Sequence, residues 1–281
     1  MDYQVLARKY RPASWDDVVG QPHVTNTLKN AILHDRLAHA YLFSGTRGVG
    51  KTSVARILAK ALNCPNVDKA RPCNTCSSCK EIDAGRNVDV LEIDGASNRG
   101  IDEVRSLREK IRYSPVGGRY RIYIIDEVHM LTTPAFNALL KTLEEPPSHA
   151  LFIFATTEPH KVPATIISRC QKFDFKWVSR NQIFDQLKSI SDAEEIQITK
   201  EALHLIASQA KGSMRDAESI LDQLISFSDN EICKEDVIQG LGLIDQELIF
   251  STTDAIIRKN ISEGIRVVNM VVNNGYSVDE F

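Results

Sequence analysis

A glycine-rich loop between an apolar run and a helical run is the feature that most constrains how this chain folds. The loop, GTRGVGKTS, follows the apolar run AYLFS at Ala40–Ser44. Four residues separate Gly45 from Gly50, and Lys51 and Thr52 come next, which is the spacing of a P-loop. A glycine-rich turn with a purely structural role is the alternative. The Lys-Thr pair, together with the flanking strand and helix patterns, counts against it.

A P-loop holds a nucleoside triphosphate by its phosphates. The backbone N–H groups close around phosphate oxygens, the lysine reaches the β- and γ-phosphates, and the following hydroxyl ligates Mg²⁺. The sequence therefore predicts that Lys51 contacts the phosphates and that Thr52 holds Mg²⁺. The predicted phosphate-binding residues are Gly45, Thr46, Arg47, Gly48, Val49, Gly50, Lys51, Thr52 and Ser53.

The pattern of the first 177 residues predicts an α/β fold. The chain has 281 residues, of which 43% are hydrophobic, so it can bury a sizeable core, and its length favours about two domains. Short apolar runs alternate with helical patterns, which predicts a five-stranded parallel sheet covered by helices on both faces. In the helical pattern TTPAFNALLKTLEEPP we expect Thr133 to cap the helix and Pro134 to take its first position. The apolar runs are residues 41–44, 88–93, 121–125, 151–155 and 171–175.

After about Trp177 only helical patterns remain. We expect three helices to form a second domain, at residues 180–191, 199–210 and 214–227. Two amphipathic stretches follow at 246–259 and 262–273, and another begins at Val278. A helix pair with an unpartnered apolar face indicates the start of a third, helical region. The expected domains are residues 1–177, 178–242 and 243–281.

Two carboxylates follow the third apolar run. Because the carboxyl ends of parallel strands share one edge of a sheet, Asp126 and Glu127 are expected beside the P-loop. We expect Asp126 to hold Mg²⁺ through water and Glu127 to act as general base on an attacking water. An acidic helix N-terminus would explain one acid but leaves the pair to chance. The pair favours triphosphate hydrolysis over mere nucleotide storage.

Two other polar residues are expected near the phosphates. Thr157 follows the next strand, where its hydroxyl or amide can hold the attacking water or contact the γ-phosphate, although threonine is also an ordinary strand residue. Ser213 and Asp216 have the spacing of a capping box, which places Arg215 in the first turn of a helix. An arginine there can pair with phosphate oxygens or with nearby acids.

Four cysteines lie within sixteen residues in the order C-x8-C-x2-C-x2-C. Four thiolates satisfy tetrahedral zinc, whereas a disulfide in a cytoplasmic protein would meet reducing conditions. Because the four thiolates leave no open position for water, the sequence predicts a structural zinc site that stabilises an insertion. The predicted ligands are Cys64, Cys73, Cys76 and Cys79.

The charge distribution is informative only locally. The net charge of −3 gives no overall attraction to nucleic acid. Between Ser97 and Arg121, however, seven basic residues stand against three acidic ones, either as a solvated helix face or as a local patch for phosphates. We expect no membrane span and no secretory leader, because no apolar run approaches the required length, and the expected compartment is the cytoplasm.

Several segments together identify a resemblance. They are LARKYRP, GQPHV, HAYLFSGTRGVGKTS, IIDEVHMLT, NALLKTLEEPP, FATTEP, SRC and GSMRDA. In this order and spacing they resemble the gamma/tau subunits of bacterial DNA polymerase III, the ATPases of the sliding-clamp loader. The resemblance runs through essentially the whole chain. It implies an AAA+ fold with a nucleotide domain that carries a zinc module at 64–79, a three-helix lid and the start of a helical collar that joins subunits into a ring.

The resemblance also implies roles for individual residues. Thr157 is similar to the first sensor residue of such ATPases and Arg215 to the second. Arg169, in SRC, is similar to the arginine finger, which acts on ATP bound in a neighbouring subunit; from the residue alone, a structural ion pair is equally compatible. The segment before the P-loop would pack on adenine. Its expected contact residues are Ala7, Tyr10, Arg11, Pro12, Val18 and Val19.

The resemblance implies a set of partners. These are clamp-loader subunits of the delta and delta-prime type, the sliding clamp, and primed DNA held by its phosphate backbone. We expect Asn98, Arg99 and Arg105, near a predicted helix start, to contact the DNA phosphates. The family extends beyond Phe281, so contacts with polymerase and helicase are expected outside this chain. The sequence leaves open whether the chain is a fragment or a short natural form.

The implied function is ATP hydrolysis that drives loading of the clamp onto primed DNA within the DNA polymerase III holoenzyme. Three alternatives stand beside it. A P-loop kinase for small molecules would need an acceptor-binding lid but has no use for an arginine finger. A zinc-bearing nucleic-acid module with structural ATP is disfavoured by Asp126 and Glu127. Another AAA+ machine, such as a branch-migration helicase, is disfavoured by the four-cysteine insertion and by LLKTLEEPP.

Overall fold

A five-stranded parallel sheet organises the first part of the molecule. The structure is a computed structural model that describes residues 4–111, 113–227, 231–243 and 246–273. The strand order is β2-β3-β4-β1-β5, and every neighbouring pair is parallel. The strands are β1 (Ala40–Ser44), β2 (Val90–Asp94), β3 (Arg121–Asp126), β4 (Ala150–Thr156) and β5 (Gln171–Asp174). All five runs predicted from the sequence therefore form strands, and the α/β fold is confirmed.

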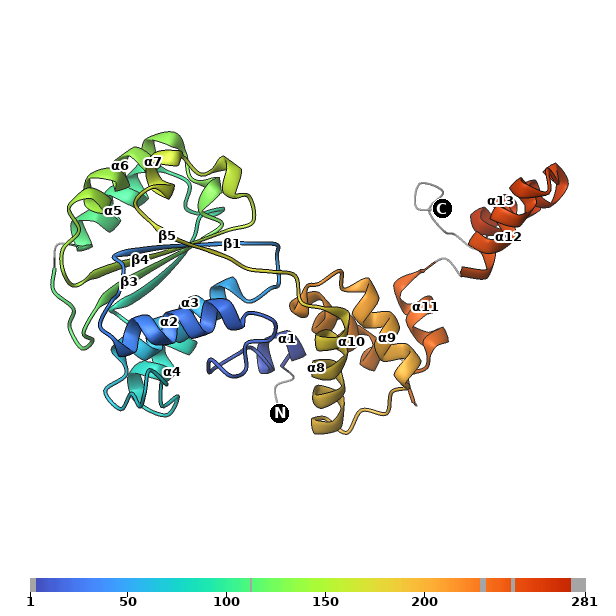
Figure 1. The fold of residues 1–281 in the computed structure, drawn as a ribbon, viewed down its shortest axis with the longest axis horizontal. Helices are drawn as coiled ribbons and strands as arrows, with labels where there is room; N and C mark the ends of the chain where they lie inside the picture. Colours follow the sequence, from blue (N-terminus) through green and yellow to red (C-terminus); the bar gives the residue numbers. More distant parts are fainter. Residues whose placement is uncertain (1–3, 112, 228–230, 244–245, 274–281) are drawn as a thin grey trace.

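Helices cover both faces of this sheet because its strands alternate apolar side chains between the two faces. Tyr41 and Phe43 of β1 pack into one core with α2 and α3, whereas Leu42 packs into the opposite core with α5 and α6. Figure 1 shows these two layers on opposite sides of the strands. The first layer contains α2 (Pro22–Leu33), α3 (Lys51–Asn63) and α4 (Ser77–Asp83). The second contains α5 (Ile101–Ile111), α6 (Thr133–Glu144) and α7 (Ala164–Ile167), with short 3-10 turns η1 (Val128–Met130) and η2 (Pro159–Lys161).

The start of α6 differs by one residue from the sequence prediction. Thr132, not Thr133, is the N-cap, and its hydroxyl accepts a hydrogen bond from the N–H of Ala135. Thr133 already has helical geometry, so Pro134 lies one position further inside the first turn. Proline is tolerated there because the first N–H groups of a helix have no partner within the helix.

Only helices follow β5 among the described residues. They are α8 (Arg180–Ala193), α9 (Lys200–Gln209), α10 (Met214–Phe227), α11 (Lys234–Leu241), α12 (Gln246–Ile257) and α13 (Ile261–Asn273). Helices α8 to α11 share one apolar core. The segment predicted to hold three helices thus contains a fourth, α11. Helices α12 and α13 pack on each other and lie beyond α11, away from the sheet (Figure 1); the stretch expected to begin at Val278 lies outside the described residues.

The short N-terminal helix α1 (Leu6–Lys9) belongs with the helical part rather than with the sheet. Leu6 is buried in the core of α8 to α11, and its N–H donates to Asp222 Oδ1 of α10 at 3.2 Å. Lys9 and Tyr10 both bond the carboxylate of Glu194 at the end of α8. Because these contacts join segments far apart in sequence, the pattern of the first 20 residues does not reveal them. In the described part of the chain, no helix is both long and apolar enough to span a bilayer.

Candidate functional site

The predicted phosphate loop lies between the end of β1 and the start of α3. Gly50 takes a left-handed conformation at φ 100° as the N-cap of α3, and Lys51 is the first helical residue. The Lys51 side chain is only 6% exposed and turns back over the loop, where its Nζ donates to the carbonyls of Gly45 and Thr46 at 2.8 Å each. Burial lowers the pKa of Lys51, and the nearby Glu127 and Asp126 carboxylates oppose that shift. The loop therefore presents a buried cation and helix N–H groups together, which is a site for phosphate.

The carboxylates that follow β3 lie against this loop. Thr52 Oγ1 donates to Asp126 Oδ2 at 2.7 Å, so the two predicted magnesium ligands touch each other. Hydroxyl and carboxylate oxygens are the ligands that Mg²⁺ prefers, and the ion usually keeps several waters beside one or two carboxylates. The pair fits a Mg²⁺ held between the loop and β3.

Glu127 and Thr157 are also brought together, although they come from different strands. Glu127 Oε2 accepts hydrogen bonds from Thr157 Oγ1 at 2.9 Å and from the Thr157 N–H at 3.2 Å. Glu127 has a φ of 45°, a left-handed conformation that is uncommon and costly for a residue with a side chain. The backbone just after β3 thus holds this carboxylate in a specific, strained orientation beside the phosphate loop.

A histidine that the sequence prediction did not include completes this group. His129 Nδ1 lies 3.0 Å from Thr156 Oγ1 and 3.3 Å from Glu127 Oε2. Its other ring nitrogen lies 3.1 Å from Glu158 Oε2. The imidazole therefore links the Glu127 carboxylate to a second carboxylate. In the sequence, only its position two residues after Glu127 indicated that this histidine belongs to the site.

A cavity of about 920 Å³ opens above the loop and extends toward α1 and α10. Six residues that the sequence assigned to the adenine line it, namely Ala7, Tyr10, Arg11, Pro12, Val18 and Val19. The loop residues from Arg47 to Ser53, both carboxylates after β3, and Arg215 line it as well. Ten further lining residues were not identified from the sequence, among them Val5, Arg8, Gln186 and Glu218. The cavity therefore joins a phosphate-binding end to a more apolar end, the arrangement that a nucleotide needs.

The N-terminus of α10 closes on the phosphate loop. The N–H groups of Met214 and Arg215 lie 3.1 and 3.4 Å from the carbonyl oxygen of Gly48. The predicted cap is present, because Ser213 Oγ accepts a bond from the Asp216 N–H at 3.2 Å. Arg215 is consequently in the first turn of α10, as predicted, and reaches the cavity from the side opposite to β3.

Arg169 lies apart from this cavity. It follows α7, where its guanidinium donates to the carbonyl of Thr165 at 2.6 Å and forms an ion pair with Glu144 at 2.7 Å. The side chain does not line the cavity of its own chain. Its role as an arginine finger stays a prediction.

The residues predicted to contact DNA lie at the start of α5. Asn98 Nδ2 donates to the Asp94 carbonyl at 3.0 Å, and Arg99 Nε donates to the Ala96 carbonyl at 2.8 Å. Both side chains thus close the turn after β2 and keep part of their donor capacity. Arg105 lies within α5, but its side chain is outside the described part of the structure.

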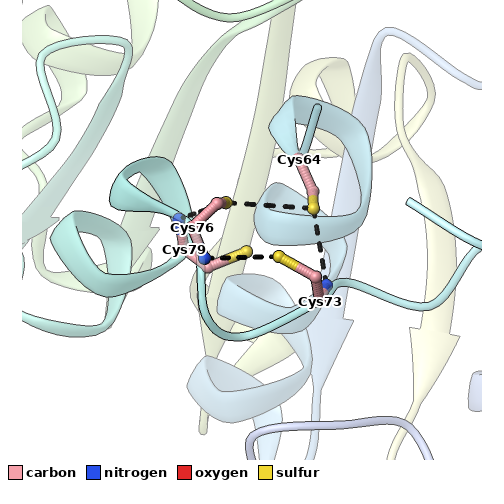
Figure 2. A group of neighbouring side chains, drawn as sticks. All are labelled: Cys64, Cys73, Cys76 and Cys79. Carbon is pink, nitrogen blue, oxygen red and sulfur yellow. Dashed lines mark hydrogen bonds between the residues drawn. The ribbon is translucent and has the colours of Figure 1, made fainter. Parts of the chain in front are cut away.

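The four predicted cysteine ligands converge between the end of α3 and the start of α4, with their sulfur atoms pointing toward one another (Figure 2). Their Sγ atoms all lie within 4.8 Å of one another, and none forms a disulfide. Hydrogen bonds from the side chain and backbone of Thr75 lower the pKa of Cys73 to about 5. Burial, by contrast, raises the pKa values of Cys64 and Cys79, so the close approach of the four sulfur atoms is what indicates that this cluster can hold a metal ion.

Comparison with known proteins identifies the family. Residues 20–179 match the family described as DNA polymerase III, delta subunit, and residues 182–230 match the DNA polymerase III clamp loader subunit, ATPase lid domain. The chain is 44% identical to the DNA polymerase III subunit gamma of Buchnera aphidicola subsp. Acyrthosiphon pisum, over all of this chain and 78% of that protein. It belongs to the gamma/tau family of DNA polymerase III clamp-loader subunits.

Two longer members of the gamma/tau family are similarly close. The subunit tau of Bacillus subtilis is 51% identical over 98% of this chain, and that of Escherichia coli is 48% identical over the same share. The chain spans 49% and 43% of these two proteins, so it matches less than half of either.

Solved structures confirm the fold of this gamma/tau family chain. The Thermotoga maritima RuvB Holliday junction branch migration motor has a TM-score of 0.62 to it, at 17% identity, and the match covers 96% of this chain and 87% of that one. At this identity the likeness shows a shared AAA+ fold and nothing about the substrate.

The contact between the loop and α10 leads to a first prediction. In Gly48→Ala the new Cβ would lie 1.9 Å from Ser213 Oγ and 3.2 Å from Arg215 Cβ, so α10 has to move away from the loop. We expect the Met214 and Arg215 amides to exchange with solvent at least about tenfold faster, because they lose Gly48 as acceptor. Hydrogen exchange resolved by residue measures this change.

Gly85→Ala is the matched control. Gly85 has a φ of 68° against 75° at Gly48, so both variants carry similar backbone strain, but no atom lies within 4 Å of a Cβ at residue 85. Both variants are expected to lose about 1 kcal/mol of stability from that strain. Equal exchange at Met214 in the two variants would contradict the role of Gly48.

Proposed function

We propose that the chain is the ATPase part of a clamp loader, in which ATP binding and hydrolysis drive the loading of a sliding clamp onto primed DNA. The convergence of Lys51, the Thr52–Asp126 pair and Glu127 on one cavity supports hydrolysis most directly. The gamma/tau family membership supports the clamp-loading role. Because the chain spans less than half of its longer relatives, the activity of the whole protein is part of the proposal.

The proposed hydrolysis needs a base, groups that hold the phosphates, and a cation that neutralises charge on the phosphate oxygens. Lys51 and the loop N–H groups hold the β- and γ-phosphates, so that the terminal phosphorus faces Glu127. A water oxygen attacks this phosphorus while the Glu127 carboxylate accepts its proton, and the bond to the β–γ bridging oxygen breaks to release ADP. Mg²⁺, held by Thr52 and Asp126, would neutralise charge on the phosphate oxygens. In this proposal Thr157 and Arg215 contact the γ-phosphate, and Arg215 couples its presence to the position of α10.

Hydrolysis is proposed to depend on assembly. Arg169 is half-buried and lies outside the cavity of its own chain. A guanidinium in this position can enter the cavity of a neighbouring subunit and stabilise charge on the transferring phosphoryl group. The partners proposed are other clamp-loader subunits of the delta and delta-prime type, the sliding clamp, and the phosphate backbone of primed DNA. We place this assembly in the cytoplasm, with the replicating chromosome.

The cysteine cluster is proposed to hold zinc in a structural role. Four sulfur atoms within 4.8 Å of one another would fill a tetrahedral coordination shell and leave no position for a reacting water. Cys64 ends α3 and Cys79 lies in α4, so the ion would join these two helices. This support is needed because the segment between them, residues 65–76, has little regular structure of its own.

Two other functions of the same fold are less well supported. A small-molecule kinase needs an acceptor site beside the γ-phosphate and has no use for an arginine finger of the kind proposed for Arg169. A branch-migration motor is compatible with the fold likeness to RuvB. The identities of 44–51% to gamma and tau subunits favour clamp loading over it.

The experiment that tests the proposed function measures steady-state ATP hydrolysis. The chain, extended through its collar, is mixed with delta-type and delta-prime-type subunits and sliding clamp, with and without primed DNA. We expect the clamp and primed DNA together to stimulate turnover. The variant Glu127→Gln should bind ATP normally and turn over at least about 100-fold more slowly, because it lacks the base. Turnover that ignores both clamp and DNA would reject clamp loading and keep only the ATPase.

A separate prediction concerns Arg169. Arg169→Ala should leave ATP affinity of the isolated chain unchanged and reduce hydrolysis in the assembled complex by about 1,000-fold, because an arginine finger acts on the neighbour's ATP. Glu144→Ala is the matched control, since it removes the same ion pair at 2.7 Å but keeps the guanidinium. Equal losses in the two variants would show that Arg169 acts through that ion pair.

A third prediction concerns the metal. The purified chain should contain about one zinc per molecule, and Cys76→Ser should lose most of it and unfold at a lower temperature, since three thiolates hold the ion less tightly. Metal analysis and thermal unfolding measure the two effects. Cys170→Ser is the control, because burial raises the pKa of Cys170 to about 12 and the residue is not in the cluster. Zinc content that is the same in both variants would reject the site.

A further inference from the structure

Helix α10 buries a carboxyl group in the nucleotide cavity. Glu218 is only 5% exposed and lies on the buried face of α10, whose other buried residues, Ala217, Leu221 and Leu224, are apolar. Its side chain nevertheless lines the cavity. None of the described residues donates a hydrogen bond to Glu218 or forms an ion pair with it. Its carboxyl oxygens are not fully enclosed, so they face the cavity, where a ligand can supply their hydrogen-bond partners.

The protonation state of this group follows from its surroundings. Burial raises the pKa of Glu218 to about 8, so the carboxyl is largely neutral at pH 7. A neutral carboxyl has one O–H donor and one carbonyl acceptor side by side. It can therefore form a pair of hydrogen bonds with a ligand that offers an acceptor next to a donor.

The position of Glu218 along α10 indicates which part of a nucleotide it meets. The N-terminus of α10 lies on Gly48 of the phosphate loop, and Arg215 is in that first turn. Glu218 is three residues, or about one helical turn, further from the phosphates. One turn beyond it, Asp222 binds the N–H of Leu6 and so fixes α1 over the same end of the cavity. Glu218 thus lies where the cavity is lined by Ala7 and other residues of the N-terminal segment, away from the phosphate end.

We propose that Glu218 recognises the base of the bound nucleotide and selects adenine by its 6-amino group. Adenine carries this N–H donor beside a ring nitrogen acceptor. The carbonyl oxygen of Glu218 accepts from the amino group, and its O–H donates to the ring nitrogen. The buried carboxyl thereby gains both of its missing partners when a nucleotide binds. The inference rests on the proposed function, since it assumes a triphosphate on the P-loop.

The test compares nucleotides that differ by one group. ATP and purine riboside triphosphate, which lacks the 6-amino group, are titrated into the chain without Mg²⁺, so that no hydrolysis occurs. We expect the parent to bind ATP about tenfold more tightly than purine riboside triphosphate. This factor is the typical effect of losing a hydrogen bond when its buried partner is left unpaired. Glu218→Leu should bind the two nucleotides equally. Glu218→Gln keeps a donor and an acceptor and should keep most of the preference.

Several outcomes would overturn the inference. If Glu218→Leu keeps the parental preference for ATP, the carboxyl does not read the amino group. If the substitution instead removes a preference for ATP over 2′-deoxy-ATP, Glu218 contacts the ribose. Thermal unfolding shows whether each variant is folded, and Glu218→Leu should be at least as stable as the parent because it removes an unpaired buried polar group.

A second variant separates this inference from the proposed function. Lys51→Ala should weaken binding of both nucleotides by the same factor, because it removes a phosphate contact and leaves the base end intact. If Lys51→Ala binds ATP as tightly as the parent, the nucleotide is not on the P-loop and the proposed function fails with it. If Lys51→Ala loses affinity while Glu218→Leu keeps the ATP preference, only the role of Glu218 is rejected.

Discussion

The burial of helix α3 beneath the sheet is the constraint on which both sites of this molecule depend. Nearly every residue of α3 from Lys51 to Asn63 is buried, including Lys60, which is fully enclosed. Eleven of its 13 residues are buried, so the helix lies between the sheet and a covering layer. Its N-terminal end forms the phosphate site, and Cys64 of the cysteine cluster follows its C-terminal end. The two sites are therefore fixed to opposite ends of one rigid element about 20 Å long.

The polar side chains at the C-terminal end of α3 explain how this helix is held. Lys60 Nζ donates to the carbonyl of Ala13 and to Asn74 Oδ1, and it pairs with Asp83 at 2.9 Å. Asn63 bonds both the N–H and the carbonyl of Tyr120, just before β3. A buried ammonium is tolerated only when each of its donors has a partner. The network thus ties the cysteine module and the N-terminal segment to the same helix.

The N-terminal segment carries this connection to the nucleotide cavity. Trp15 Nε1 donates to the carbonyl of Ala70 in the cysteine module at 2.8 Å, and the indole is buried. On either side of Trp15, the same segment supplies Pro12 and Val18 to the cavity wall. A metal ion in the cysteine cluster would therefore support the wall of the nucleotide site from behind, although it takes no part in the chemistry.

The sequence predicted the parts of the site that depend on local pattern. The P-loop, the acids after β3 and the cysteine spacing each lie within a short segment, so residue type and spacing are enough to identify them. The rule that parallel strands end at one edge of a sheet predicted that Glu127 and Thr157 lie near each other, but not that they form a hydrogen bond. The packing of α1 on α10, which accompanies the burial of Glu218, depends on contacts between segments far apart in the sequence, such as Leu6 and Asp222. No local sequence pattern predicts these contacts. The only indication in the sequence was an acidic residue on an otherwise apolar face of the helix.

The polar groups of the nucleotide site form hydrogen bonds with one another. Thr52 bonds Asp126, Glu127 bonds Thr157, and Lys51 bonds the loop carbonyls. Breaking any of these bonds so that the same group can hold Mg²⁺, water or phosphate would cost about 1 kcal/mol net. Triphosphate and Mg²⁺ together offset that cost, because they supply stronger, charge-assisted partners to all three groups.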